Sequence, residues 1–297
     1  MLGAVAYMAA VVAAGYFARR ISLLPESAYF KINDFVYYVS LPALIFAKLA
    51  VADLSSAPLL VAANALAIII ALAFTAALWK LRILSPGTCM LLASGFFFGN
   101  VVYMGFPLVQ AAFGEEALAT AAIVSAVYNV LMFTLGVFLM HAIVGDGKGK
   151  GLNEKLFKNT ILISCVLGAA VSFLKISVPA PAISALGLLG SLTVPLALFS
   201  LGLFMHGKAF SKNIREAGLL CFFKMAVFPL LFFISAMVVG LSGQPYRVSL
   251  LEAVMPLAVT NFIIADKFGA DKRAMAQAIV ISTLIAFAAL LIFGASV

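Results

Sequence analysis

Charged side chains are scarce in this sequence of 297 residues, where Asp, Glu, Lys and Arg together make up 10%. Soluble domains average about 25% charged and about 45–50% apolar residues. Here hydrophobic residues reach 65%, and the mean hydropathy is +1.18. A soluble fold could not bury that much apolar surface. The composition therefore predicts an integral membrane protein whose surface is covered by lipid.

Cysteine and histidine are also rare. The three cysteines, Cys89, Cys165 and Cys221, each stand alone in an apolar run, so neither a disulfide framework nor a thiolate metal site is indicated. The glycine-rich segment 145–151 lacks the Gly-Lys-Ser/Thr order of a nucleotide-binding loop, so ATP-driven transport is not indicated either. We expect no metal and no cofactor.

Long apolar runs are what the sequence does contain. A transmembrane helix needs about 20 apolar residues, and ten runs approach that length. They span 2–18, 35–51, 58–79, 88–112, 118–144, 159–176, 181–205, 217–240, 248–265 and 273–294. Arg19 and Arg20 follow the first run and no basic residue precedes it, which is the reverse of a cleavable signal peptide. The sequence predicts an all-α fold of ten transmembrane helices, the first of them retained.

The basic residues favour one orientation in the membrane. Fifteen of the nineteen Lys and Arg residues lie in the loops after odd-numbered helices. By the positive-inside rule these loops are cytoplasmic, which places both termini outside a bacterial-type inner (plasma) membrane. This distribution explains the net charge of +8 better than nucleic-acid binding does.

The sequence repeats itself after five helices. Pro42 and Pro195, in leucine-rich contexts of helices two and seven, are 153 positions apart, and the Phe-Gly pairs ending at Gly114 and Gly269 are 155 apart. Because five is an odd number, the second copy must enter the membrane with the opposite orientation, as in the inverted repeats of many secondary transporters. The expected units are a first repeat at 1–144, a cytoplasmic connecting loop at 145–155 and a second, inverted repeat at 156–297.

Helix-breaking residues interrupt helices four and nine at matched positions. Gly99, Gly105 and Pro107 fall inside helix four, and Pro256 lies in helix nine where an offset of 155 places it. Proline lacks an amide donor and clashes with the preceding turn. Broken backbone is tolerated in the membrane only beside protein or a water-filled cavity, so the matched pair favours a midplane binding site over two packing kinks. The helix N-termini at such breaks would attract an anion.

Polar residues lie near both breaks. Asn100 and Asn261 fall in the broken windows, and we predict that they contact the substrate. The alternative is that they form hydrogen bonds that only hold the helices together. Tyr128 and Asn129 of helix five are expected to face the same region, with packing as the somewhat favoured role of Asn129.

Two ionisable residues lie inside predicted spans, where a buried charge is costly and suggests function. Glu252, one turn before Pro256, either couples a proton or cation or lies in water at the outer mouth. Lys224 either serves the substrate or extends its amine to the cytoplasmic surface. The sequence leaves both choices open.

Four stretches carry the motifs on which a family resemblance depends. They are 15–46 with its Leu-Pro-Ala-Leu-Ile-Phe end, 99–115 with Gly-Asn, Tyr, Gly and Pro in order, 192–202 and 255–268. Together they resemble the auxin efflux carrier family, within the bile, arsenite and riboflavin transporter superfamily, which includes plant exporters and bacterial carriers of malate- and malonate-type acids. The resemblance implies a fold like that of bile-acid symporters and sodium–proton antiporters. Helices one, two, six and seven would form a scaffold, and the other six would form a transport domain that moves as an elevator. The substrate-binding residues that it implies are Asn100, Pro107, Tyr128, Pro256 and Asn261, with Ser40 and Pro42 on the facing scaffold helix.

These features predict a secondary transporter, not an enzyme, that carries a small organic anion such as a mono- or dicarboxylate or an auxin-like acid. The alternative is a sodium- or proton-coupled symporter of a bile-acid-like or other amphipathic solute. An intramembrane protease is a weaker rival, because Ser242 has a Gly-x-Ser-Gly context but His141 and His206 lie near the opposite membrane face. The expected partners are the anion and membrane lipids, not nucleic acid, and a homodimer stays open.

Overall fold

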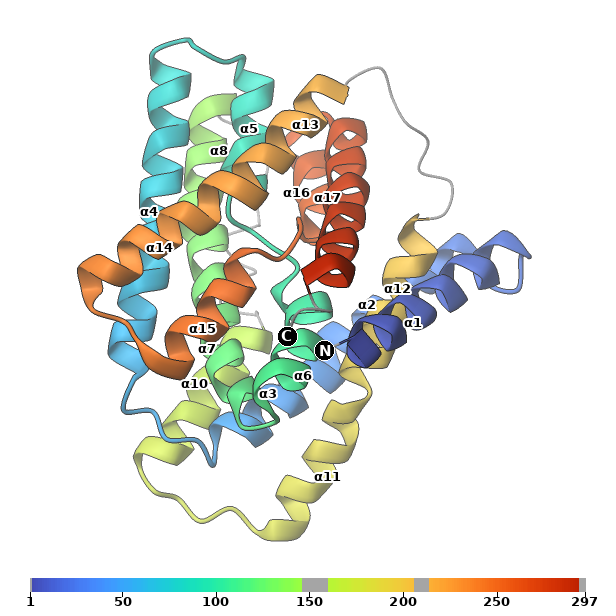
Figure 1. Cartoon of the computed structure of the whole chain (residues 1–297), viewed down its shortest axis with the longest axis vertical. Helices are drawn as coiled ribbons and strands as arrows, with labels where there is room; N and C mark the ends of the chain where they lie inside the picture. Colours follow the sequence, from blue (N-terminus) through green and yellow to red (C-terminus); the bar gives the residue numbers. More distant parts are fainter. Residues whose placement is uncertain (1, 146–159, 206–213, 294–297) are drawn as a thin grey trace.

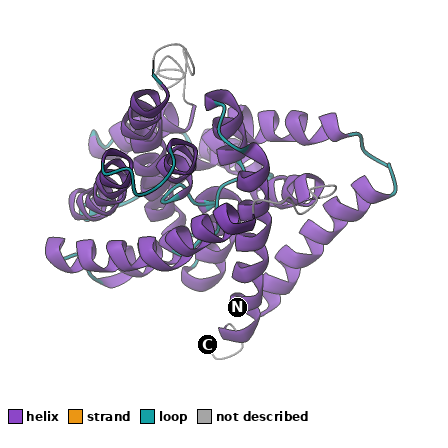
Figure 2. Ribbon diagram, turned by 90° about the horizontal axis from the view of Figure 1, so that it is seen from above, coloured by secondary structure: helices purple, strands orange, loops and turns teal. Residues whose placement is uncertain are grey.

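The computed structural model describes residues 2–145, 160–205 and 214–293, and every regular element in these ranges is a helix (Figures 1 and 2). The first half contains α1 (Leu2–Arg20), α2 (Glu26–Phe35), η1 (Val36–Ser40), α3 (Leu41–Leu49), α4 (Ala57–Lys80), α5 (Pro86–Gly95), η2 (Val101–Gly105), α6 (Phe106–Phe113), α7 (Ala117–Leu131), η3 (Met132–Gly136) and α8 (Val137–Val144). The second half contains α10 (Thr160–Phe173), α11 (Ala180–Ser191), α12 (Thr193–Met205), α13 (Ile214–Phe222), η4 (Phe223–Val227), α14 (Phe228–Val239), α15 (Gly243–Ala253), α16 (Thr260–Phe268) and α17 (Lys272–Phe293). The predicted all-α class is confirmed for these residues.

Six helical runs are long and apolar enough to cross a membrane, judged by length and composition among the described residues. They are Ser27–Leu49, Ala57–Lys80, Ala117–Val144, Ala180–Met205, Ile214–Val239 and Lys272–Ala289. Two shorter apolar helices, Val101–Phe113 and Ile163–Phe173, accompany them. Of the predicted connecting loop 145–155, only Gly145, which follows α8, lies within the described residues.

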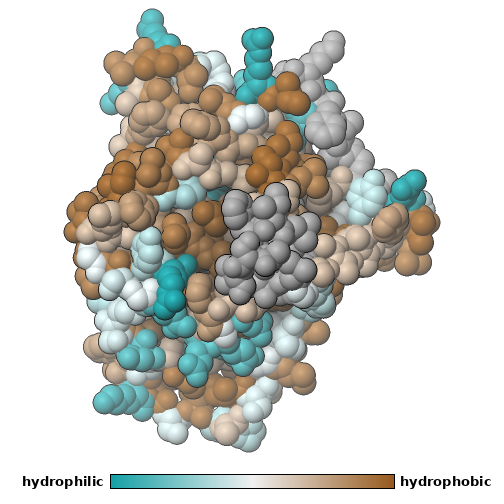
Figure 3. All heavy atoms as spheres, in the orientation of Figure 1, coloured by the Kyte–Doolittle hydropathy of each residue, from teal (hydrophilic) through white to brown (hydrophobic). Residues whose placement is uncertain are grey.

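Large apolar side chains cover much of the surface. Phe138, Phe173, Leu188 and Val238 are each at least 70% exposed. Brown hydrophobic side chains accordingly occupy large parts of the face in Figure 3. Such exposure would be unfavourable in water, and lipid offers it a solvent of matching polarity.

Four turns of π-helix, η1 to η4, interrupt the long helical runs. Three of them end directly before a helix with a proline in its first turn: Pro42 in α3, Pro107 in α6 and Pro229 in α14. Proline has no N–H to donate, and its ring clashes with the carbonyl four residues earlier. A turn widened by one residue makes room for that ring while the chain stays helical, which is why these prolines do not end their runs.

The helices pack in two groups. In the first packing group, α1 and α2 lie against α12, and α3 lies against α10 and α11. In the second packing group, α4 lies against α14 and α7, α5 against α8, and α13 and α16 against α17. Figure 1 shows α1, α2, α11 and α12 to the right and below, with α4, α5, α8 and α14 to the left and above.

Two glycines allow the closest approach within the first packing group. A side chain on Gly15 of α1 would collide with the backbone of Phe199 in α12. Likewise, a side chain on Gly202 of α12 would collide with the Val12 carbonyl oxygen of α1. The two helices therefore touch backbone to backbone, which small residues permit between membrane helices.

A candidate substrate site at the crossing of two broken helices

Two segments that interrupt helices cross near the middle of the molecule. Residues 96–100 separate α5 from η2, and residues 254–259 separate α15 from α16. Gly99 and Leu257 form an isolated antiparallel bridge. The Asn100 N–H donates to the Pro256 carbonyl oxygen at 2.7 Å, and the Ala258 N–H donates to the Phe98 carbonyl oxygen at 3.1 Å. Backbone N–H and carbonyl groups that lose their helical partners at the two breaks thus form hydrogen bonds with each other. Backbone that water cannot reach needs such partners.

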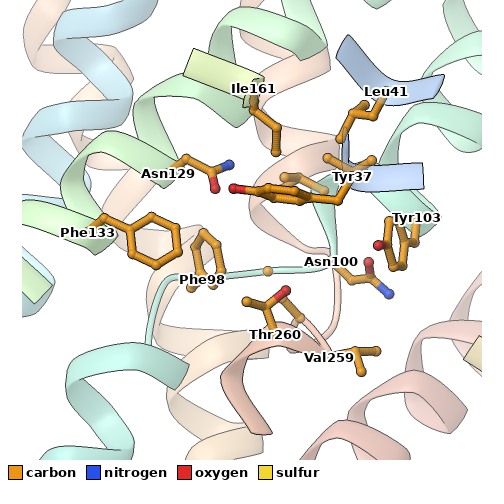
Figure 4. Close-up of a pocket in the computed structure, with 14 residues that line it drawn as sticks. Tyr37, Leu41, Phe98, Asn100, Tyr103, Asn129, Phe133, Ile161, Val259 and Thr260 are labelled. Carbon is orange, nitrogen blue, oxygen red and sulfur yellow. The ribbon is translucent and has the colours of Figure 1, made fainter. Parts of the chain in front are cut away.

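A cavity of about 60 Å³ lies against this crossing (Figure 4). Its wall includes the first residues of both restarted helices, Val101 of η2 and Thr260 of α16. The N-terminus of a helix carries partial positive charge and free N–H groups. The cavity therefore brings two such ends to one small volume.

The two asparagines of the breaks have different roles in the structure. Asn261 is fully buried, and its Nδ2 donates to the Phe98 carbonyl oxygen at 2.9 Å, so it ties the second break to the first. Asn100 lines the cavity, and its Nδ2 has no hydrogen-bond partner although the residue is 4% exposed. A buried donor without an acceptor is rare and costly, which makes the Asn100 amide a candidate to bind a ligand or water.

The neighbouring residues Tyr128 and Asn129 of α7 also differ. Tyr128 is fully buried between Phe97 and Phe228, with ring centroids 6.3 and 5.9 Å away, and it is not part of the cavity wall. Asn129 does line the cavity, and its Nδ2 donates to the Ser125 carbonyl oxygen in its own helix at 2.8 Å. The structure thus places Asn129 at the crossing and Tyr128 behind it.

The remaining predicted residues lie around the crossing in structural positions. Pro107 is buried in the first turn of α6, and Pro256 supplies the carbonyl oxygen that Asn100 binds. Ser40 is buried and accepts a hydrogen bond from the Thr193 hydroxyl at 3.0 Å, while Pro42 is half-buried in α3. None of these four is part of the cavity wall.

Three polar residues of the cavity wall were missing from the predicted site: Tyr37 of η1, Tyr103 of η2 and Thr260 of α16. In Figure 4 the Tyr37 phenol extends across the cavity toward Asn129. Tyr103 belongs to the Gly-Asn-x-x-Tyr pattern of helix four, which could have identified it. Tyr37 belongs to another helix, and no pattern in its own segment distinguishes it from Tyr38.

A larger cavity of about 250 Å³ adjoins the first. The two share Tyr37, Tyr103, Phe133, Val259 and Thr260. The wall of the larger cavity further includes Tyr29, Asn33, Asp34, Tyr38, Ile263, Ile264 and Lys267. Four tyrosines and a charge of each sign lie in its wall, and we call this larger cavity the vestibule.

Both alternatives that placed Lys224 and Glu252 in contact with water are wrong. Each residue is fully buried. The Lys224 Nζ donates to the Ala253 carbonyl oxygen at 2.6 Å instead of extending to a membrane surface. Glu252 lies beside Gly105, where an added Cβ would meet its carboxylate carbon at 2.8 Å.

Comparison with known proteins completes the identification. A family model described as "Membrane transport protein" matches residues 1–148 and 149–294. An uncharacterized transporter of Methanocaldococcus jannaschii is 25% identical over 96% of this chain and 94% of its own length. A Rhizobium meliloti protein named "Putative malonate transporter" is 27% identical over 92% of this chain and 88% of its own length. Auxin efflux carrier component 5 of Arabidopsis thaliana is 21% identical over 66% of this chain and 67% of its own length. The chain therefore belongs to the membrane transport protein family that includes the auxin efflux carriers, and it is a multi-pass membrane transporter rather than an enzyme.

Proposed function

We propose that this protein is a secondary carrier of a small organic anion that binds at the crossing. The observation that carries the proposal is the unpaired Asn100 Nδ2 in a cavity that two helix N-termini line. Amide donors and helix ends attract an anion without the cost of a full buried charge. A relative with malonate in its name supports a mono- or dicarboxylate as the substrate class.

The proposed architecture is a ten-helix inverted repeat, with units at 1–144 and 156–297. Contacts at a constant offset support it. Gly15 packs on the backbone of Phe199, and Gly168 packs on the backbone of Phe46. The two glycines are 153 positions apart, and so are the two phenylalanines. Ser40 and Thr193, which share a hydrogen bond, are also 153 positions apart. Contacts that recur at one offset are what two copies of the same unit would make.

The two packing groups support an elevator mechanism. We propose that the first packing group is the scaffold and that the second, with the crossing, is the transport domain. The cavity at the crossing lies between them, since Leu41 of α3 and Ile161 of α10 come from the first group and the crossing segments adjoin α5 and α16 of the second. Sliding of the second group along the first would carry an anion at the crossing from one membrane face to the other.

The proposed topology has both termini outside, and this orientation makes the vestibule cytoplasmic. Asp34 and Lys267 of the vestibule then lie near the basic loops that the positive-inside rule assigns to the cytoplasm. On the opposite side, Lys48 and Glu115 form an ion pair at 3.3 Å. A single cysteine introduced at Lys267 should react with a membrane-impermeant maleimide only in inverted vesicles, and reaction in intact cells would reverse this topology.

Transport assays in proteoliposomes test the function. Radiolabelled malonate should accumulate with the purified protein and not in empty liposomes. Thr260→Trp fills the cavity and should abolish uptake, whereas Gln110→Trp, at an exposed position of α6, should retain it. Equal uptake by both variants would move the site away from the crossing. Failure of every mono- and dicarboxylate to bind or move would refute the substrate class.

A further inference from the structure

A buried ammonium group lies behind the crossing, on the side away from the cavity. Lys224 belongs to η4, is fully buried, and has its Nζ 4.9 Å from the centre of the Phe228 ring. The Nζ donates a hydrogen bond to the carbonyl oxygen of Ala253, the last residue of α15. The C-terminal end of a helix carries partial negative charge, so the ammonium compensates this end of the broken helix.

Only one residue of backbone separates the ammonium from the cavity. A Cβ on Gly99 would lie 3.1 Å from the Lys224 Nζ and 3.3 Å from the Met255 carbonyl oxygen. Gly99 itself forms part of the cavity wall. A positive charge at this distance, in surroundings without bulk water, acts strongly on an anion in the cavity. Lys224 is therefore a positioning residue that acts through its field and does not touch the anion.

Glu252 is the acid that accompanies this lysine. Its carboxyl group is fully buried, and neither oxygen has a hydrogen-bond partner. Glu252 directly precedes Ala253, whose carbonyl oxygen binds the Lys224 ammonium, and Tyr128 of α7 is the other titratable group near it among the described residues. The other elements packed against α15, which are α4, α6, α14 and η2, contribute none. An ionised carboxylate with no donor is costly in such a place, and its protonation removes that cost.

We propose that Lys224 and Glu252 form a built-in proton-coupling pair, so that binding of an anion at the crossing is accompanied by uptake of one proton on Glu252. This inference rests on the proposed function. With Glu252 ionised, the pair has no net charge and attracts an anion weakly. With Glu252 protonated, the pair has a net charge of +1, which the bound anion balances.

The stoichiometry of the pair is simple. One proton from water adds to one oxygen of the Glu252 carboxylate when one anionic charge enters the cavity, and both leave together on the other side. Lys224 supplies the resident positive charge, which is left unbalanced when Glu252 is protonated. On this proposal the coupling ion is the proton, and sodium is not required.

Binding of malonate across a series of pH values tests the pair. In the wild type, affinity should fall as pH rises, by up to about tenfold per pH unit for one linked proton. Replacement of sodium by choline should leave it unchanged. In Glu252→Gln the charge at this position is fixed, so the steep pH dependence should disappear. Titration of malonate itself is common to both proteins and cancels in their ratio.

Lys224→Met should weaken binding at every pH, because the resident positive charge is lost. Tyr128→Phe, which removes the other titratable group near Glu252, should keep the wild-type pH profile. A Glu252→Gln variant with the wild-type slope, or affinity that depends on sodium, would overturn the pair while the proposed function stands. Absence of any binding in the wild type would instead refute the proposed function.

Discussion

The two breaks look alike in sequence and differ in construction. The second break is tied down: the Asn261 amide binds the Phe98 carbonyl oxygen, and the Leu257 N–H donates to the Ser282 hydroxyl of α17 at 3.2 Å. The first break is tied only through its backbone, and its asparagine, Asn100, keeps its amide nitrogen unpaired beside the cavity. One break thus provides support, and the other provides the free donor. Matched motifs need not share a role.

The largest effect should come from loss of the tie. Asn261→Ala removes one of the two donors to the Phe98 carbonyl oxygen, which keeps the Ala258 N–H, and leaves a cavity at a fully buried position, so it should cost about 1–3 kcal/mol. We expect a clear fall in the thermal unfolding temperature in detergent. Asn33→Ala is the matched control, since Asn33 binds only the Tyr29 carbonyl oxygen of its own helix at 2.8 Å. Equal losses from both substitutions would mean that Asn261 holds the breaks together no more than a half-buried amide that bonds within its own helix.

A somewhat smaller loss should follow removal of the second support. Ser282→Ala removes the acceptor of the buried Leu257 N–H and should cost about 1–2 kcal/mol of stability. Its neighbour Thr283 binds only the Ile279 carbonyl oxygen, at 2.7 Å, so Thr283→Val tests the loss of a hydroxyl that does not reach the break. Chemical unfolding curves should separate the two variants. Identical curves would show that the crossing does not depend on α17.

The free donor should affect binding more than folding. Asn100→Ala removes an amide nitrogen that has no partner in the protein, so the unfolding temperature should stay near that of the wild type. Malonate affinity should fall about tenfold, which corresponds to about 1.4 kcal/mol. Isothermal titration and thermal unfolding on the same preparation give both values. If stability falls and affinity does not, the roles of the two asparagines are reversed.

The smallest effect concerns the opposite wall. Tyr37→Phe keeps the ring over the cavity and removes the hydroxyl that points toward Asn129, so we expect affinity to fall about two- to fivefold, the range of one hydrogen bond. Tyr38→Phe, on the next residue, lines only the vestibule and should change affinity less. Titration with malonate again measures both. An equal response would indicate that Tyr37 serves the vestibule rather than the crossing.

The sequence predicted the two breaks because glycine, proline and asparagine have local consequences. It could not distinguish Asn100 from Asn261, since their difference depends on which amide reaches the Phe98 carbonyl oxygen. The alternative in which the Lys224 amine reaches the cytoplasmic surface was wrong for a geometric reason. The run from α13 to α14 crosses the molecule diagonally in Figure 1. The position of a residue along this run therefore does not tell how far its side chain lies from the membrane surface. Tyr37 was not predicted, because only the tertiary fold brings its segment to the cavity.

The π-helical turns set the rotational phase of the helices that they interrupt. An α-helix turns by about 100° per residue, so a turn with one extra residue rotates everything after it by about that angle. Deletion of one residue within η1 would turn α2 relative to α3 and take Tyr37 away from the cavity, while the hydropathy of the span would hardly change. Gain or loss of one residue in such a turn therefore lets a carrier present a different set of side chains to its substrate while the same helix still spans the bilayer.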